Sequence, residues 1–226
     1  MTELLISLSV FIAFHVVPAI APVRRALIST VGLGIYIVGY SLLSVALLVW
    51  VSWAYMNADT TVLWSQWPWT RWVPVLVMPV SCLMLVSTLS EPNALSVGVK
   101  ADRFDPARPG IVSITRHPLI WALALWALAH LAPNGDTASL LLFGLFAALA
   151  LFGPWSLDRK KRRDMGMAQW QRLAQFTSSV PFWAIVRGCA QLDWRGIGWR
   201  RALAAGALYL AVLLGHEWTI GVSPFP

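Results

Sequence analysis

The chain has 226 residues, of which 58% are hydrophobic and 12% are charged, with a mean hydropathy of +0.67. Soluble domains carry roughly twice that charged fraction, so this composition excludes an ordinary soluble globular protein. The net charge of +7 would suggest a nucleic-acid ligand in a soluble chain. Here the basic residues flank apolar runs, as they do in membrane proteins, and no nucleic-acid partner is expected. The sequence predicts an all-α, polytopic membrane bundle that forms a single integral membrane domain over residues 1–226.

Apolar stretches near the roughly 20 residues that cross a hydrocarbon core divide the chain. Six spans are predicted, at about 3–21, 29–56, 72–90, 117–133, 137–156 and 200–220. The first is expected to be a retained helix, because the leading residues include Glu3 and no positive charge, unlike a secretory signal. Pro133, Asn134 and Gly135 make a tight turn between the fourth and fifth spans, which predicts an antiparallel helical hairpin.

Lysine and arginine are distributed unevenly between alternate loops. The loops after the first, third and fifth predicted spans carry nearly all of them, namely Arg24 and Arg25, then Lys100, Arg103, Arg108 and Arg116, then ten more from Arg159 to Arg201. This bias predicts that these loops are cytoplasmic and that both termini face outward. Residues 157–199 contain no predicted span and should form a basic cytoplasmic or interfacial segment. Within it, residues 167–186 are expected to lie in the interface as an amphipathic helix and an apolar turn.

All four histidines, His15, His117, His130 and His216, fall in or at the edge of predicted spans. Ionisable side chains there usually face the bundle interior and mark functional sites, although polar side chains can also simply join helices. The spans contain no internal carboxylate except Glu217 at an edge, which disfavours a zinc or di-iron site. Imidazoles in an apolar bundle suit haem, and without a C-x-x-C-H motif the haem would be b-type. By depth, His15 could pair with His130 or with His117, and His130 with His216.

Several other residues are candidates for the same site. Arg116 could hold a haem propionate through a bidentate contact, or it could be one of the inner-leaflet charges. Trp126 precedes His130 by one helical turn and could line a ring pocket, or it could pack against lipid. Tyr36, Tyr40 and Asn134 could donate hydrogen bonds. Cys82 and Cys189 provide neither a disulfide framework nor metal-ligand spacing.

Several motifs together resemble one family. They are F-x-x-x-H-x-x-P (Phe11, His15, Pro18), R-H-P (Arg116 to Pro118), A-L-W-A-L-A-H (Ala124 to His130), N-G-D (Asn134 to Asp136), the D-R-K/R stretch at Asp158, T-S-x-x-P-F (Thr177 to Phe182) and a final G-V-S-P. Over nearly its whole length the chain resembles the NnrU family of bacterial inner-membrane proteins, which is associated with denitrification. The resemblance implies a multi-pass protein of the bacterial inner membrane that acts in nitrite and nitric oxide metabolism.

The chain is also similar to the plastid 15-cis-zeta-carotene isomerases, which use haem b for redox-dependent cis–trans isomerisation. This second resemblance implies haem b with His15 and His130 as the axial ligands of its iron. It also implies a lipophilic small molecule or nitric oxide as a partner besides haem and membrane lipid. The cysteine that those isomerases use in ligand switching falls on Ala127 here. Ala127 therefore argues against the isomerase mechanism while leaving bis-histidine haem binding intact.

Two alternatives from other classes remain. Integral membrane isoprenylcysteine and phospholipid methyltransferases also begin a helix with R-H-P, here Arg116, His117 and Pro118, and Asp158 could stand for their acidic residue. Those enzymes prefer R-H-P-x-Y and a pair of glutamates, whereas this chain has Ile120 and a lone Asp158, so the motif match is weak. The other alternative is a non-enzymatic assembly factor in which the histidines only join the helices.

Overall fold

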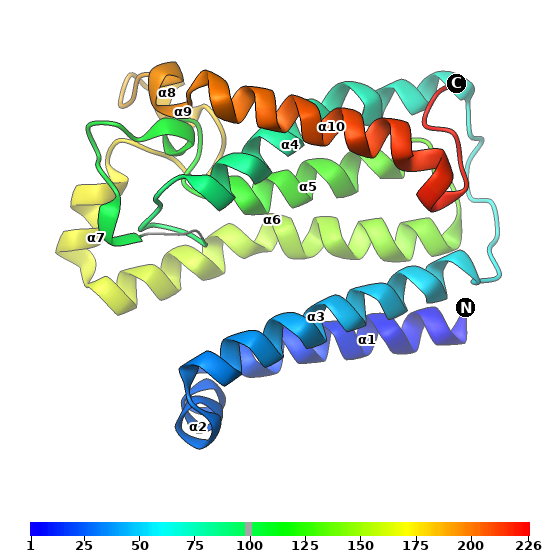
Figure 1. The fold of residues 1–226 in the computed structure, drawn as a ribbon, viewed down its shortest axis with the longest axis horizontal. Coiled ribbons are helices and arrows are strands. Elements are labelled where there is room, and N and C mark those ends of the chain that lie inside the picture. The colour runs from blue at the N-terminus through cyan, green and yellow to red at the C-terminus, as the bar shows by residue number, and fades with distance from the viewer. Residues whose placement is uncertain (98–100) are drawn as a thin grey trace. The chain divides into compact units, whose positions relative to one another are not determined.

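The computed structural model describes residues 1–97 and 101–226, and the regular elements of these residues are all helices (Figure 1). They form two compact units, one of Met1–Ser65 with Gly135–Leu142 and the other of Gln66–Asn134 with Phe143–Pro226. The single domain over residues 1–226 stays a prediction. Lys100, counted above among the basic loop residues, lies outside the described residues.

The first unit pairs two apolar helices in antiparallel fashion. It contains α1 (Thr2–Val16), a 3₁₀ turn (Val17–Ala19), α2 (Ala21–Val31) and α3 (Leu33–Met56). Trp50 Nε1 donates to Glu3 Oε1 at 3.3 Å at one end, and the rings of His15 and Tyr40 lie 5.7 Å apart at the other. The first predicted span ends early because the chain turns at Pro18. The second begins late because Gly32, with a φ of 81°, separates α2 from α3.

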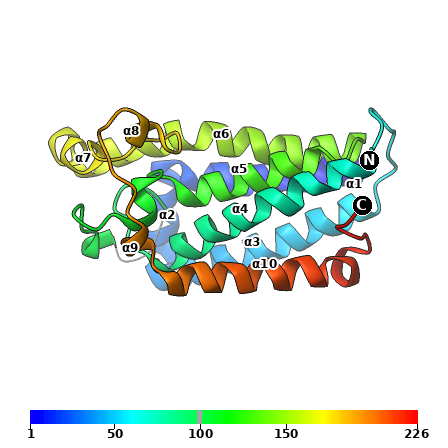
Figure 2. The same ribbon diagram turned by 90° about the horizontal axis from the view of Figure 1, so that it is seen from above.

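The second unit is built around three long helices and a shorter one. These are α4 (Trp72–Ser90, after a 3₁₀ turn at Pro68–Arg71), α5 (Pro118–Leu131), α6 (Thr137–Met165, within this unit from Phe143) and α10 (Trp199–Ile220). Ser81 Oγ of α4 donates to the Ala122 carbonyl of α5 at 2.8 Å, and Tyr209 of α10 donates to the Val75 carbonyl of α4 at 3.0 Å. Helix α4 therefore contacts both α5 and α10, as Figure 2 shows.

Helices α5 and α6 form the predicted antiparallel hairpin. The Trp126 ring lies 5.7 Å from the Phe146 ring, whereas Ile120, earlier in α5, lies against Gly153, later in α6. The fifth span was predicted to end at residue 156, but α6 continues to Met165. Lysine and arginine are good helix formers, so the basic run extends the helix beyond its apolar part.

Short helices gather at one end of the second unit. They are α7 (Met167–Ala174), α8 (Trp183–Val186) and α9 (Trp194–Ile197), beside 3₁₀ turns at Ala101–Arg103 and Gly110–Ser113 (Figure 1). The Gly110 N–H donates to Asp193 Oδ2 at 3.0 Å, and a small core of Leu95, Ile111 and Ile197 lies there. The two basic loops of this unit therefore meet at the same end, here called the basic end. Residues 167–186 form α7, as the predicted amphipathic helix, followed by a turn and the short helix α8.

Among the described residues, four helices are long and apolar enough to cross a membrane, at Leu33–Met56, Pro68–Ser90, Thr137–Met165 and Trp199–Ile220. The shorter apolar helices Thr2–Val16 and Pro118–Leu131 account for the other two predicted spans. Large apolar side chains project from the long helices, with Leu76 71%, Phe152 75% and Leu214 75% exposed. Such faces suit contact with lipid, and the predicted all-α membrane bundle is confirmed.

Candidate functional site

His130 lies in the last turn of α5, and its ring is oriented by its own helix. Nδ1 lies 2.7 Å from the carbonyl oxygen of Trp126. Because a carbonyl oxygen only accepts, Nδ1 carries the proton, and in the neutral ring Nε2 keeps its lone pair. Nε2 makes no hydrogen bond within the described part of the chain. Metal-ligating histidines characteristically donate from the other ring nitrogen in this way, so the ring is prepared for a ligand at Nε2.

Aromatic rings surround the His130 imidazole. The Phe143 ring of α6 stacks on it at 5.4 Å and 27°, and the Trp126 ring lies 5.7 Å away. Trp126 also makes edge contacts with Phe143 at 5.2 Å and with Phe146 at 5.7 Å. Ala127, beside them on α5, is fully buried. These residues form an apolar, π-rich surround from two helices of the second unit.

His15 shows the same arrangement in the first unit. Its Nδ1 donates to the Phe11 carbonyl at 2.7 Å, again four residues back along the helix, and its Nε2 has no partner among the described residues. The Phe11 ring stacks on the imidazole at 4.1 Å, the Phe14 ring lies edge-on at 5.5 Å, and the Tyr40 ring lies at 5.7 Å. Both imidazoles thus combine a proton on Nδ1, an available Nε2 and aromatic neighbours.

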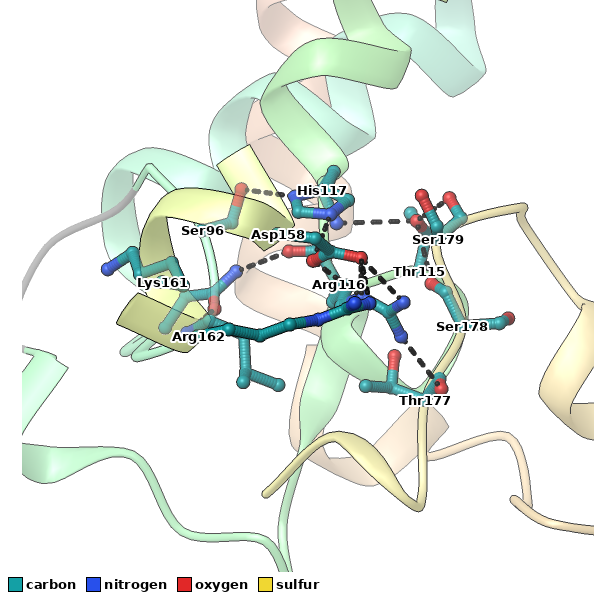
Figure 3. A network of polar contacts seen from close by, with 12 residues as sticks. Ser96, Thr115, Arg116, His117, Asp158, Lys161, Arg162, Thr177, Ser178 and Ser179 are labelled. Atoms are coloured by element: carbon teal, nitrogen blue, oxygen red, sulfur yellow. Dashed lines mark hydrogen bonds and ion pairs between the residues drawn. The ribbon is translucent and has the colours of Figure 1, made fainter. Parts of the chain in front are cut away.

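Arg116 and His117 point elsewhere, toward a single carboxylate on α6 (Figure 3). The Arg116 guanidinium binds both oxygens of Asp158, with Nη2 at 2.8 Å from Oδ2 and Nε at 3.0 Å from Oδ1. His117 Nε2 lies 3.0 Å from the same Oδ1. The three residues are 8%, 0% and 6% exposed for Arg116, His117 and Asp158. They form a closed, charge-assisted cluster that we call the hub.

Loops on both sides of α5 complete the hub. Ser96 Oγ lies 2.9 Å from His117 Nδ1, and Asn93 Nδ2 donates to the Arg116 carbonyl at 3.0 Å. Arg116 Nη1 donates to the Thr177 carbonyl at 3.1 Å. With Ser96 as hydroxyl donor and Asp158 as acceptor, both nitrogens of the neutral His117 ring are satisfied. The hub therefore joins the start of α5, the end of α6 and two loops.

The hub suits structural bracing better than ligand binding. Its polar atoms already bind one another, and the Arg116 guanidinium also lies 5.3 Å from the Trp170 ring. Arg116 and His117, predicted as cofactor contacts, meet each other here but lie at the opposite end of α5 from His130. Asp158, weighed as the acid of a methyltransferase site, does join the R-H-P motif, but in an ion pair with little exposure.

The remaining candidates occupy less specialised positions. Asn134 Nδ2 donates to the His130 carbonyl at 2.8 Å and so caps the end of α5. His216 is half-buried, with Nδ1 2.8 Å from the Val222 carbonyl. Tyr36 stacks near Tyr40 at 5.9 Å. Within residues 1–97 and 101–226, no group of three or more histidine, cysteine, aspartate or glutamate side chains is placed to hold a metal ion.

Sequence reasoning missed the contribution of Ser96, Asn93 and Thr177 to the hub. Asn93 and Ser96 are ordinary loop residues whose types and positions carry no signal. Thr177 begins the T-S-x-x-P-F motif, but that motif does not reveal its contact with Arg116. Asp158 was open to inference, because it is the one carboxylate at the junction between an apolar run and a basic one. An unpaired carboxylate there would be costly, so a cationic partner at the end of a neighbouring span could have been expected.

Comparisons with known proteins agree with the motifs. A family model described as NnrU protein matches residues 3–224. The 15-cis-zeta-carotene isomerase of Arabidopsis thaliana is 39% identical over 80 residues, which is 35% of this chain and 21% of that protein. The corresponding protein of Zea mays is 35% identical over 83 residues, 37% of this chain and 22% of that one. The matches thus span about a fifth of the length of these relatives. No solved structure matches.

Proposed function

The chain belongs to the NnrU family, and we propose that it is a haem b-binding, isomerase-like membrane protein whose iron ligands are His15 and His130. The observation that carries the proposal is the shared state of the two imidazoles. Each donates from Nδ1 to the carbonyl four residues back at 2.7 Å and leaves Nε2 available. A histidine that only joins helices would be expected to form a hydrogen bond to a neighbouring helix through its second ring nitrogen.

The surroundings of both rings fit a porphyrin. A haem requires apolar walls around its macrocycle and one or two nitrogen ligands for its iron. His15 lies among Phe11, Phe14 and Tyr40, and His130 lies against Phe143 and Trp126. These contacts are all between aromatic or imidazole rings. The residues present are therefore of the right kind for the group.

When bound, haem b supplies a redox-active iron inside an apolar environment. The chain's own residues bind and orient it, with Nε2 of each histidine as the ligating atom and the Nδ1 hydrogen bonds fixing the ring planes. Ala127 stands where the isomerases have their ligand-switching cysteine, so only the two histidines would hold the iron. A lipophilic small molecule or nitric oxide is the proposed substrate class. The bacterial inner membrane and denitrification are the setting that the family resemblance implies.

Arg116 and His117 serve this proposal as positioning residues. The hub fixes the start of α5 against the end of α6, and these helices also carry His130 and Phe143. A shift of one helix along the other would separate the imidazole from its stacked ring. Arg116 would have to give up its hydrogen bonds to Asp158 in order to bind a haem propionate. We therefore do not assign a propionate contact to Arg116.

The test is an absorption spectrum of the detergent-purified protein, expressed with haem supply, for the wild type, His15→Ala and His130→Ala. We expect a low-spin Soret and α band in the wild type and its loss or shift to high spin in either variant. His216→Ala is the matched control, because its imidazole also lies near a helix end but is bonded to a C-terminal carbonyl. Its spectrum should equal that of the wild type.

A colourless wild-type protein after haem reconstitution would contradict the proposal. If that protein instead bound S-adenosylmethionine, the methyltransferase alternative would be favoured, and Arg116, His117 and Asp158 would be its site. Colour that persists in both the His15→Ala and the His130→Ala variants would show that other residues hold the haem.

A further inference from the structure

The basic end carries a segment without acidic residues. From Met165 to Leu192 the chain contains Arg172 and Arg187 but no aspartate or glutamate. Large apolar side chains in this segment are exposed, namely Phe176 46%, Val180 55%, Phe182 48%, Trp183 48% and Val186 74%. An exposed apolar patch flanked by cations is the composition of a surface that enters a membrane interface.

The backbone of the turn before α8 is fixed in a conformation that leaves this patch exposed. Phe182 has a φ of 63°, the one positive value among the described residues other than glycine. A bulky residue adopts this conformation only when the surrounding structure fixes it. Here the Phe182 N–H donates to the Ile114 carbonyl at 2.9 Å, and the Ala184 N–H donates to Ser178 Oγ at 3.0 Å. The exposed side chains are therefore held by anchored backbone.

Arginine–tryptophan pairs surround the same end of the unit. The guanidinium carbon of Arg187 lies 4.7 Å from the ring centre of Trp183 on α8. Arg159 lies 5.7 Å from Trp155 on α6, and Arg200 lies 5.6 Å from Trp199 on α10. Trp155 is 68% and Trp199 67% exposed, so these rings are not part of the core. Tryptophan prefers the headgroup level, and a guanidinium beside it presents N–H donors that match phosphate.

These arginines lack carboxylate partners. Within the part of the chain that the structure describes, no ion pair involves Arg159, Arg187 or Arg200. The acidic side chains nearby already have other hydrogen-bond partners. Asp158 belongs to the hub, and Asp193 accepts from the Gly110 and Gly196 N–H groups. The surface is therefore positively charged and open to an anionic ligand.

We propose that this surface, made of α7, α8 and the three arginine–tryptophan pairs, binds the headgroups of anionic phospholipids. The positions of two pairs on α6 and α10 favour lipid over a soluble acidic protein as the partner. Both helices are long enough to cross the membrane, and the Arg159–Trp155 and Arg200–Trp199 pairs lie where their apolar parts end, which corresponds to headgroup level. Anionic lipids attract basic residues at this depth. The inference does not depend on haem binding.

The first test measures lipid selectivity of the full-length protein in detergent. Dioleoylphosphatidylglycerol should raise the apparent melting temperature in a saturable way, whereas dioleoylphosphatidylcholine should not. The triple variant Arg159→Gln, Arg187→Gln, Arg200→Gln should need more than about tenfold higher phosphatidylglycerol for the same shift. Arg71→Gln is the control for loss of a single arginine, because Arg71 lies at the opposite end and donates to the Phe225 carbonyl. Equal shifts with both lipids, or an unchanged triple variant, would overturn the proposal.

The second test measures how deeply α8 lies in the membrane. A spin label on Val186→Cys, in a Cys189→Ser background, reports from an exposed side chain, while the remaining Cys82 is buried. In phosphatidylglycerol vesicles the label should be more accessible to oxygen than to a water-soluble nickel chelate. A water-exposed label would contradict the proposal. A label shielded by dimerisation, seen as a doubled mass in detergent, would instead assign the surface to a second copy and overturn it.

Discussion

His117 Nε2 lies 3.0 Å from Asp158 Oδ1, which joins the residue that precedes α5 to the last part of α6. Arg116 binds the same carboxylate through two nitrogens. A buried carboxylate is tolerated only when it is paired and hydrogen-bonded, and here one carboxylate has both kinds of partner. The hub therefore stabilises the helix pair as long as all of its members are present.

Asp158→Asn should be strongly destabilising. The substitution leaves the buried Arg116 guanidinium without its counter-charge, and breaking a buried pair costs about 3–5 kcal/mol. Unfolding of the detergent-solubilised protein, followed by circular dichroism against denaturant, measures the free energy change. Asp164→Asn is the matched control, since Asp164 is 52% exposed and its nearest pairing with Arg163 is 3.7 Å. The control should change stability by less than about 0.5 kcal/mol. Equal effects of the two substitutions would contradict the buried hub.

Arg116→Lys should also destabilise, although it conserves the charge. An ammonium group is a point donor and does not reproduce the planar guanidinium that spans both Asp158 oxygens and reaches the Thr177 carbonyl at 3.1 Å. At least one charge-assisted hydrogen bond is lost, which costs about 1.5–3 kcal/mol. The same unfolding measurement should rank Arg116→Lys between the wild type and Asp158→Asn. Wild-type stability in the lysine variant would show that only the charge of Arg116 is used.

The helices could be predicted because each follows from local composition. Apolar runs of nearly bilayer length locate α3, α4, α6 and α10, and the turn at Pro133, Asn134 and Gly135 correctly predicts the α5–α6 hairpin. The errors are at helix ends. The predicted first span did not stop at Pro18, and the predicted fifth span stopped before the basic run. In both places the end of the apolar run and the end of the helix-forming sequence fall at different residues, so hydropathy alone gives the wrong helix boundary.

The site could be predicted only in part. Histidines in apolar spans were recognisable as unusual, and the i−4 hydrogen bonds of His15 and His130 are local features compatible with that expectation. The hub depends on contacts between residues 42 positions apart, as between Arg116 and Asp158. A sequence without aligned relatives contains no pairing information over that distance. Arg116 was therefore read as an inner-leaflet charge or a propionate partner.

Stability of the first unit should depend on pH through Asp136. Its carboxylate accepts from the Ser139 N–H at 2.9 Å, from Ser139 Oγ at 2.8 Å and from Thr60 Oγ1 at 2.8 Å. Burial alone would raise the pKa of the Asp136 carboxyl, but these hydrogen bonds outweigh it and hold the pKa below its ordinary value. A lowered pKa in the folded state means that the stabilisation is present above about pH 4 and is lost as the pH falls through the folded value.

Asp136→Ala tests this prediction. At neutral pH it removes a cap-like acceptor at the start of α6 and should cost about 1–2 kcal/mol. The difference from the wild type should shrink below about pH 4, where the wild-type carboxyl becomes protonated. Chemical unfolding at pH 7 and pH 3 measures both differences. Asp59→Ala is a control, since Asp59 is exposed in the preceding loop and should show the same small effect at both pH values. A constant difference for Asp136→Ala would contradict the assignment.

Phe143→Ala should expose the dependence of His130 on its aromatic neighbours. Phe143 is 6% exposed and stacks on the imidazole, so its truncation leaves a cavity between α5 and α6 that costs about 3–5 kcal/mol. The freed imidazole should also broaden the haem spectrum or weaken haem retention in the reconstituted protein. Phe152→Ala on the same helix is the control, because Phe152 is 75% exposed and truncation there leaves no cavity. Equal stability loss from both substitutions would place Phe143 outside the packed pair. Lost stability with an unchanged haem spectrum would separate its packing role from the cofactor site.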